Sequence, residues 1–139
     1  MTFAHLVKKY LPVVARVLMG LLFLMTGLNG FLNFLPMPAN LPAGLVAFSI
    51  AMLNTGYLFQ LAMGVQLIVA VMLLLNRYVP LALTLIAPII VNIICIHWFL
   101  DRSGLPMAGF VLVLELYLAW VYRKSFKPML MAKVTPENQ

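Results

Sequence analysis

The sequence predicts an all-α membrane protein, a transmembrane four-helix bundle with one short extra helix, on two observations. Four apolar stretches, at residues 10–34, 56–75, 78–100 and 106–123, each approach the roughly 20 residues that a helix needs to cross the hydrocarbon core. Hydrophobic residues make up 65% of the chain and charged residues 9%. A soluble domain of this size could not bury so much apolar surface, so the lipid bilayer must cover the rest. The length of 139 residues predicts a single membrane domain over residues 1–139.

Prolines and chain breaks set the limits of these elements. The first stretch should end before Pro36 and Pro38, because proline cannot continue the helical hydrogen-bond ladder. Residues 41–53 are apolar but too short to cross, which is typical of an interfacial or re-entrant helix between spans 1 and 2. Pro88 should kink the third span and free the carbonyl of Thr84. The tail at residues 124–139 is polar and is predicted to fray.

The charges are distributed unevenly around the predicted spans. Nine Lys and Arg residues stand against three acidic residues, for a net charge of +6. One predicted side of the membrane carries Lys8, Lys9, Arg77, Arg123, Lys124, Lys127 and Lys133. The other side carries only Arg102, offset by Asp101. The positive-inside rule therefore predicts a multi-pass protein with both termini in the cytoplasm. The basic residues do not alternate with aromatic residues as in a nucleic-acid surface, so no nucleic-acid partner is expected.

Two opposite charges interrupt the spans. Arg16 lies about 9 Å below Tyr10, and Glu115 about 10 Å from Tyr122, at 1.5 Å per residue. Each shares a helix face with small residues that permit close approach. A lone charge in hydrocarbon is costly, so we predict an intramembrane ion pair between Arg16 and Glu115. It would be either a lock between two helices or a site that handles protons or a head group.

Further polar side chains occur above this predicted pair. They are Gln66, Asn92, His97, Gln60, Asn29 and Asn33. Together they could line a polar column that opens outward, whereas for each residue alone hydrogen bonding between helices is the favoured interpretation. The chain contains two histidines and one cysteine, so neither a metal site nor an internal disulfide is predicted. No catalytic residue is predicted either.

These features, taken in order, resemble the DoxX-type family of small bacterial integral membrane proteins. The resemblance covers residues 14–130: an Arg on a Gly-rich first span, then LLLNRYVPLALTLIAPIIVNIICIHWFLD, then LYLAWVYRKSFKPML. It implies a four-helix membrane bundle in the bacterial inner (cytoplasmic) membrane. It also implies redox-associated partners, since some members are subunits of thiosulfate:quinone oxidoreductases and others associate with redox-protective enzymes. Relatives often carry a Glu where this chain has Gln66, so a titratable group is absent from that position.

Two functional hypotheses follow. The first is a non-catalytic membrane subunit or scaffold that organises partner proteins, for instance redox enzymes, or that self-associates as a homo-oligomer. The second is a quinone-reactive subunit of a membrane oxidoreductase, in which the polar column, Arg16 and Glu115 manage a quinone head group or its protons. Whether Arg16 and Glu115 are accessible to a ligand or sealed by packing distinguishes the two. No cofactor motif is evident, and a quinone is the cofactor that the second hypothesis requires.

The charge asymmetry makes a topological prediction. A reporter fused after the last residue should report the cytoplasm, and one inserted near Gly104 should report the periplasm, because the basic residues gather on the side of the two termini. A periplasmic signal from the C-terminal fusion would contradict the predicted orientation.

Overall fold

The computed structural model describes residues 2–137, and all regular structure within that range is helical. This confirms the all-α prediction. In chain order the elements are α1 (Phe3–Leu32), α2 (Ala43–Asn54), α3 (Leu58–Leu74), α4 (Val79–Phe99), a 3-10 turn (Arg102–Gly104), α5 (Leu105–Val121), the single turn α6 (Arg123–Phe126) and a second 3-10 turn (Lys127–Leu130).

Within the described residues, three helical segments are long and apolar enough to cross a membrane: α1, α4, and α5 with the 3-10 turn before it. The helices α2 and α3 are bent by 93° relative to each other, and they supply a fourth segment only if the bent pair counts as one. The structure therefore supports a multi-pass membrane protein with three to four spanning helices. The helix α3 alone has 17 residues, or about 26 Å at 1.5 Å per residue, and counts as a spanning segment only together with α2.

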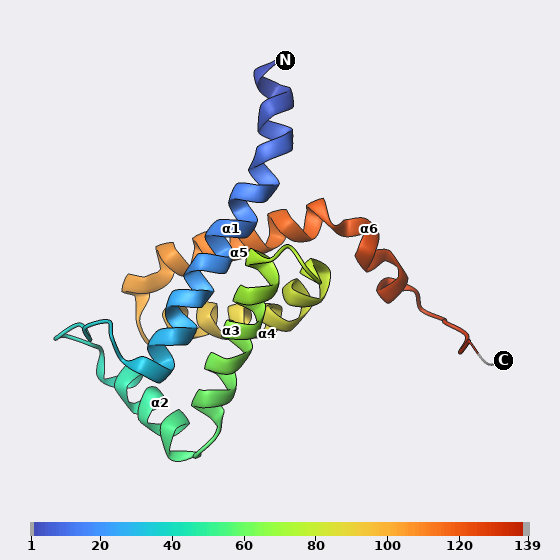
Figure 1. Cartoon of the computed structure of the whole chain (residues 1–139). Coiled ribbons are helices and arrows are strands. Elements are labelled where there is room, and N and C mark those ends of the chain that lie inside the picture. The colour runs from blue at the N-terminus through green and yellow to red at the C-terminus, as the bar shows by residue number, and fades with distance from the viewer. Residues whose placement is uncertain (1, 138–139) are drawn as a thin grey trace.

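The first helix is longer at its start than predicted and shorter at its end. It begins at Phe3, because nothing between Thr2 and the predicted start near residue 10 breaks a helix. It ends at Leu32, before either proline, because Asn33 adopts a left-handed conformation with φ 48°. Asparagine tolerates this conformation better than most residues and often ends helices in this way. In Figure 1 the first turns of α1 project beyond the other helices.

The short helix predicted over residues 41–53 is present as α2 (Ala43–Asn54). None of its residues is buried, although its sequence is almost entirely apolar. Such a helix makes no contribution to the core of this chain, so its apolar surface is available for lipid or for another protein.

The main helices do not all run alongside one another. In Figure 1 α1 and α3 lie side by side, and α5 crosses α1 at a steep angle. The contacts agree with this view, because α1 touches α3 along much of its length and α5 over a shorter stretch, while α4 packs on α3 and α5. This arrangement does not confirm the transmembrane four-helix bundle that the sequence predicts.

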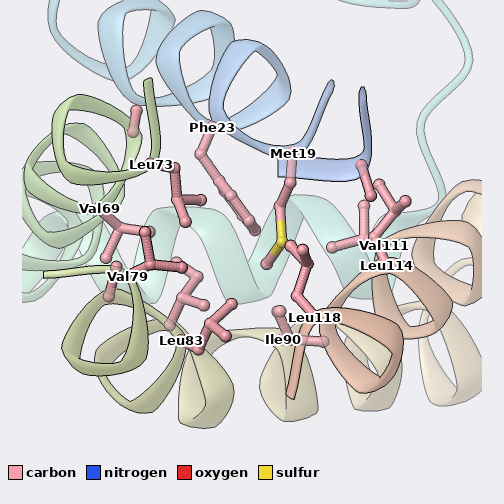
Figure 2. Close-up of a cluster of buried hydrophobic side chains, with 14 residues drawn as sticks. Met19, Phe23, Val69, Leu73, Val79, Leu83, Ile90, Val111, Leu114 and Leu118 are labelled. Atoms are coloured by element: carbon pink, nitrogen blue, oxygen red, sulfur yellow. The ribbon is translucent and has the colours of Figure 1, made fainter. Parts of the chain in front are cut away.

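The core lies where α1, α3, α4 and α5 meet. Figure 2 shows Met19 and Phe23 of α1 pointing toward Leu73 of α3, Leu83 of α4 and Leu118 of α5. Much of the remaining apolar surface is exposed, with Val113 and Leu116 each at least 60% accessible. A soluble protein would bury such side chains, and a bilayer accommodates them.

Glycines on α1 allow it to approach α3 closely. A Cβ at Gly27 would lie 2.9 Å from the side chain of Leu67 and 3.2 Å from its backbone nitrogen. At Gly20 it would meet Leu74, and at Gly30 it would overlap Met63. The glycine face of α1 thus packs on α3 in one antiparallel register.

The C-terminal tail is partly ordered. The turn α6 and the 3-10 turn after it continue from α5, and Phe126 packs against the core. The prediction of a frayed tail from residue 124 is therefore wrong for residues 124–130, because an apolar side chain anchors the first turns. Residues 131–137 have no helix, and residues 138–139 lie outside the described part.

The α1–α3 contact predicts opposite effects for two glycine substitutions. Gly27→Ala should lower the free energy of unfolding in detergent by about 1–2 kcal/mol, because the backbone nitrogen of Leu67 cannot move aside. Gly64→Ala is the matched control on α3, since an added Cβ there meets nothing within 4 Å. It should be neutral or stabilising, because alanine favours helix by about 1 kcal/mol over glycine. Equal thermal stabilities for the two variants would contradict the close packing.

Candidate functional site

A cavity of about 440 Å³ lies between α1, α3, α4 and α5, with residues 35 and 37 of the following loop at its rim. Four of the six side chains predicted for a polar column line it, namely Asn29, Asn33, Gln66 and His97. The other two, Gln60 and Asn92, are exposed and line no part of it. The predicted column is therefore a smaller polar site, because helical periodicity places Gln60 and Asn92 on the outer faces of α3 and α4.

Thr26 belongs to this site and was missed by the sequence analysis. Its hydroxyl lies 2.5 Å from Oε1 of Gln66, to which it donates, and 3.1 Å from the carbonyl oxygen of Leu22. The spacing of Thr26, Asn29 and Asn33 puts all three on one face of α1, a signal that was present in the sequence. Gln66 is 4% exposed, so its bond to Thr26 fixes a buried amide across the α1–α3 contact.

Asn29 connects the helix to the rim of the cavity. Its side-chain oxygen accepts a hydrogen bond of 2.7 Å from the N–H of Leu35, and its backbone oxygen accepts from the N–H of Asn33. The side-chain oxygen is therefore committed to the backbone. The amide nitrogen of Asn29 is left as the group that can donate into the cavity.

His97 is held in one orientation by the turn that follows α4. Its Nδ1 lies 3.1 Å from the carbonyl oxygen of Asp101 and 3.8 Å from that residue's carboxylate. A carbonyl can only accept, so Nδ1 carries the proton and Nε2 of the neutral ring is an acceptor. A Cβ at Gly104 would overlap the imidazole ring, so any larger residue there would displace the ring from this orientation. The hydroxyl of Ser103 donates to the carboxylate of Asp101 and holds the pKa of Asp101 below its usual value.

Arg16 is sealed by packing rather than open to a ligand. It is 8% exposed, and its guanidinium donates to the carbonyl of Leu73, with that of Leu74 at 3.5 Å. These carbonyls belong to the last turn of α3, where the regular helical N–H donors run out. The carbonyl of Leu73 also accepts a hydrogen bond of 3.2 Å from the N–H of Asn76, so Arg16 supplements the donors of the turn. The negative end of the helix dipole also favours a cation at this position. Arg16 therefore caps the C-terminal end of α3.

Glu115 is equally buried but lies in a different environment. It is 8% exposed, and its Oε2 has no hydrogen-bond partner. It lines a separate hollow together with Thr84 and Pro88 of α4 and Phe126 of α6. This hollow opens on another side of α4 from the polar cavity, and the two share no lining residue.

The structure does not form the predicted ion pair between Arg16 and Glu115. Among residues 2–137, only His97 and Asp101 bring ion-pairing atoms within 4.0 Å of each other. The reason is the packing of the glycine face of α1, which carries Arg16, against α3 rather than against α5. Matched depth and opposite sign predicted a pair, but backbone carbonyls of α3 satisfy Arg16 instead. Among the described residues, Oε2 of Glu115 has no hydrogen-bond partner.

Comparisons with known proteins add no relative: no family model, curated protein or solved structure matches this chain significantly. Among residues 2–137 there is also no group of three or more His, Cys, Asp or Glu side chains that could hold a metal ion. The chemistry of the site therefore rests on amides, one hydroxyl and one imidazole.

The two charges should behave independently in a double-mutant cycle. Arg16→Leu should lower stability in detergent by about 1.5–3 kcal/mol, because it removes a charged donor from the carbonyls of α3. Glu115→Leu should leave stability unchanged or raise it, because it removes a buried oxygen that has no partner. The double variant should show the sum of the two effects within about 0.5 kcal/mol. Recovery of stability in the double variant would instead reveal a coupled pair.

Proposed function

We propose that this protein is a non-catalytic membrane subunit that binds the head group of a quinone in the cavity between α1, α3, α4 and α5. The observation that carries the proposal is the gathering of Asn29, Asn33, Gln66 and His97 around one cavity with otherwise apolar walls. Its volume of about 440 Å³ lies within the range of ordinary ligand sites.

The polar groups match both redox states of a quinone. Amide nitrogens of Asn29 and Gln66 can donate to a quinone carbonyl, because the oxygens of both amides already accept bonds. Nε2 of His97 can accept a hydrogen bond from the hydroxyl of a quinol. Phe59, Met63 and Ile93 supply the apolar wall on which a ring can pack.

The same lining argues for a subunit rather than a complete enzyme. Among the described residues, His97 is the one titratable side chain that lines the cavity, and the carboxylate of Asp101, 3.8 Å from Nδ1 of His97, is not part of the lining. A quinone held here would need an electron donor from elsewhere. We therefore propose that a partner redox protein supplies the electrons and that this chain positions the quinone for it.

The membrane setting of the proposal follows the sequence. We propose four spanning helices, with α3 as the short one, in the bacterial inner membrane and with both termini in the cytoplasm. In that orientation the cavity, with Asn33 and His97 near the outer ends of their helices, lies toward the periplasm. The resemblance to the DoxX-type family supports a link to redox partners and belongs to the proposal.

A second candidate function is anchoring or assembly without a ligand. The exposed apolar helix α2 favours it, because none of its residues is buried within the chain. For this function, a partner protein or a second copy of the chain would pack on the apolar surface of α2. Otherwise lipid covers that surface.

Quinone binding can be tested with a substitution that removes one amide and keeps the volume. Gln66→Leu should weaken binding of decylubiquinone by ~10-fold, because a buried donor to the quinone carbonyl is lost. Binding is followed by quenching of tryptophan fluorescence in mild detergent, together with mass spectrometry of copurifying quinones. Thr26 keeps its bond to the carbonyl of Leu22 in this variant, so the helix contact has a polar partner left.

Gln60→Leu is the matched control, since it changes an exposed glutamine of the same helix that does not line the cavity. Quinone should bind to it as to the unaltered protein. Equal affinities of the Gln66→Leu and unaltered proteins, or no quinone binding by either, would exclude the proposed ligand and leave the assembly function.

A further inference from the structure

The hollow beside Glu115 is separate from the proposed quinone site and is not used by it. It is formed by Leu83, Thr84, Ala87, Pro88 and Val91 of α4, Glu115 and Ala119 of α5, and Phe126 of α6, and its volume is about 470 Å³. Its walls are apolar except at Glu115 and Thr84. Glu115, a residue that is only 8% exposed, lines the hollow, and its Oε2 has no hydrogen-bond partner.

The polar groups around the hollow accept hydrogen bonds and have few donors to offer. The carboxylate of Glu115 only accepts when ionised. The hydroxyl of Thr84 donates to the carbonyl of Pro80 at 2.9 Å and is therefore in use. Pro88 has no N–H to return to the carbonyl of Thr84, the residue four positions before it, so that acceptor loses its usual donor. A ligand that suits this hollow must bring donors.

The charges around the hollow further restrict which ligands can bind there. Among residues 2–137, no Lys, Arg or His lines the hollow, so none of them supplies a counter-ion for Glu115 there. An ionised carboxylate left in such surroundings is costly unless a cation accompanies it. Phe126 adds an aromatic ring to the wall, and aromatic faces attract ammonium groups. The absence of basic side chains around the hollow disfavours an anionic or phosphate-bearing group in the same space.

We propose that the hollow between α4, α5 and α6 binds the protonated amine of a membrane-soluble amphiphile, with Glu115 as its counter-ion and the carbonyl of Thr84 as a second acceptor. The apolar chain of the amphiphile extends over Ala87 and Val91 toward the lipid. A simple lipophilic amine fits better than the amine of a phospholipid, because a phospholipid carries its phosphate next to the amine. A free lipophilic amine and an aminophospholipid carry the same protonated amine, and the test distinguishes these two sources.

The test uses the purified full chain in dodecyl maltoside and measures its thermal stability with four additives. Dodecylamine is the probe, dodecanol is the neutral control of equal length, and phosphatidylethanolamine is compared with phosphatidylcholine. A ligand that binds only the folded protein raises Tm as its concentration passes its Kd. Dodecylamine should raise Tm saturably where dodecanol does not. The Tm series then gives an apparent affinity for each variant.

Two variants remove the site in different ways. Glu115→Gln keeps the shape of the side chain and removes its charge, and should weaken the apparent affinity for dodecylamine by ~10-fold or more. Ala119→Leu keeps the carboxylate but fills the hollow, and should cause a similar loss. Asn92→Ala is the control, because Asn92 is exposed on α4 next to Val91 and lines neither cavity. It should bind dodecylamine as the unaltered protein does.

Each outcome decides the proposal. A response to dodecylamine that both site variants lose supports the amine site and a free amphiphile as its source. A response to phosphatidylethanolamine over phosphatidylcholine that Glu115→Gln removes supports the same site with a lipid as its source. Equal responses to dodecylamine and dodecanol, or an amine response that survives Glu115→Gln, overturn it. If one variant does not fold, the other variant and the comparison of amine with alcohol still decide. Quinone binding should be unchanged in Glu115→Gln, so the two proposals can fail separately.

Discussion

The contact of Arg16 with the end of α3 is the interaction on which the rest of the structure depends. A guanidinium within the membrane and the last carbonyls of a helix are each costly when left alone, and here each satisfies the other. The contact also fixes the register of α1 against α3, since the close approaches at Gly27 and Gly30 follow from the same antiparallel alignment. That register sets Thr26 opposite Gln66 and so builds the polar side of the cavity.

The sequence was sufficient for features that depend on local patterns. Apolar length and composition predicted helices and a membrane environment, and the short apolar segment at residues 41–53 predicted a short helix before α3. The grouping of polar side chains by depth also predicted that Asn29, Asn33, Gln66 and His97 lie together, and all four line one cavity. The exact end of α1 was missed, because the left-handed conformation of Asn33 acts before Pro36 does.

The sequence alone could not predict which helix packs against each helix face. A helix face rich in glycine shows that some backbone approaches closely, but it does not say which one. The prediction that α5 would be the neighbour produced the ion pair of Arg16 with Glu115, whereas α3 occupies that face and offers backbone acceptors. Backbone carbonyls carry no signature in a sequence. A prediction that pairs side chains by depth and sign will therefore miss them wherever a helix ends inside the membrane.

The fit of Gly104 under the ring of His97 has a consequence for how related sequences can change. Any side chain at position 104 would displace the imidazole from the carbonyl of Asp101, so the two positions should evolve as a pair. Relatives with a larger residue at 104 are expected to carry a smaller one at 97, and then to lack the acceptor at the rim of the cavity. Glycine at position 104 is therefore a condition for keeping a histidine at position 97 in its present orientation.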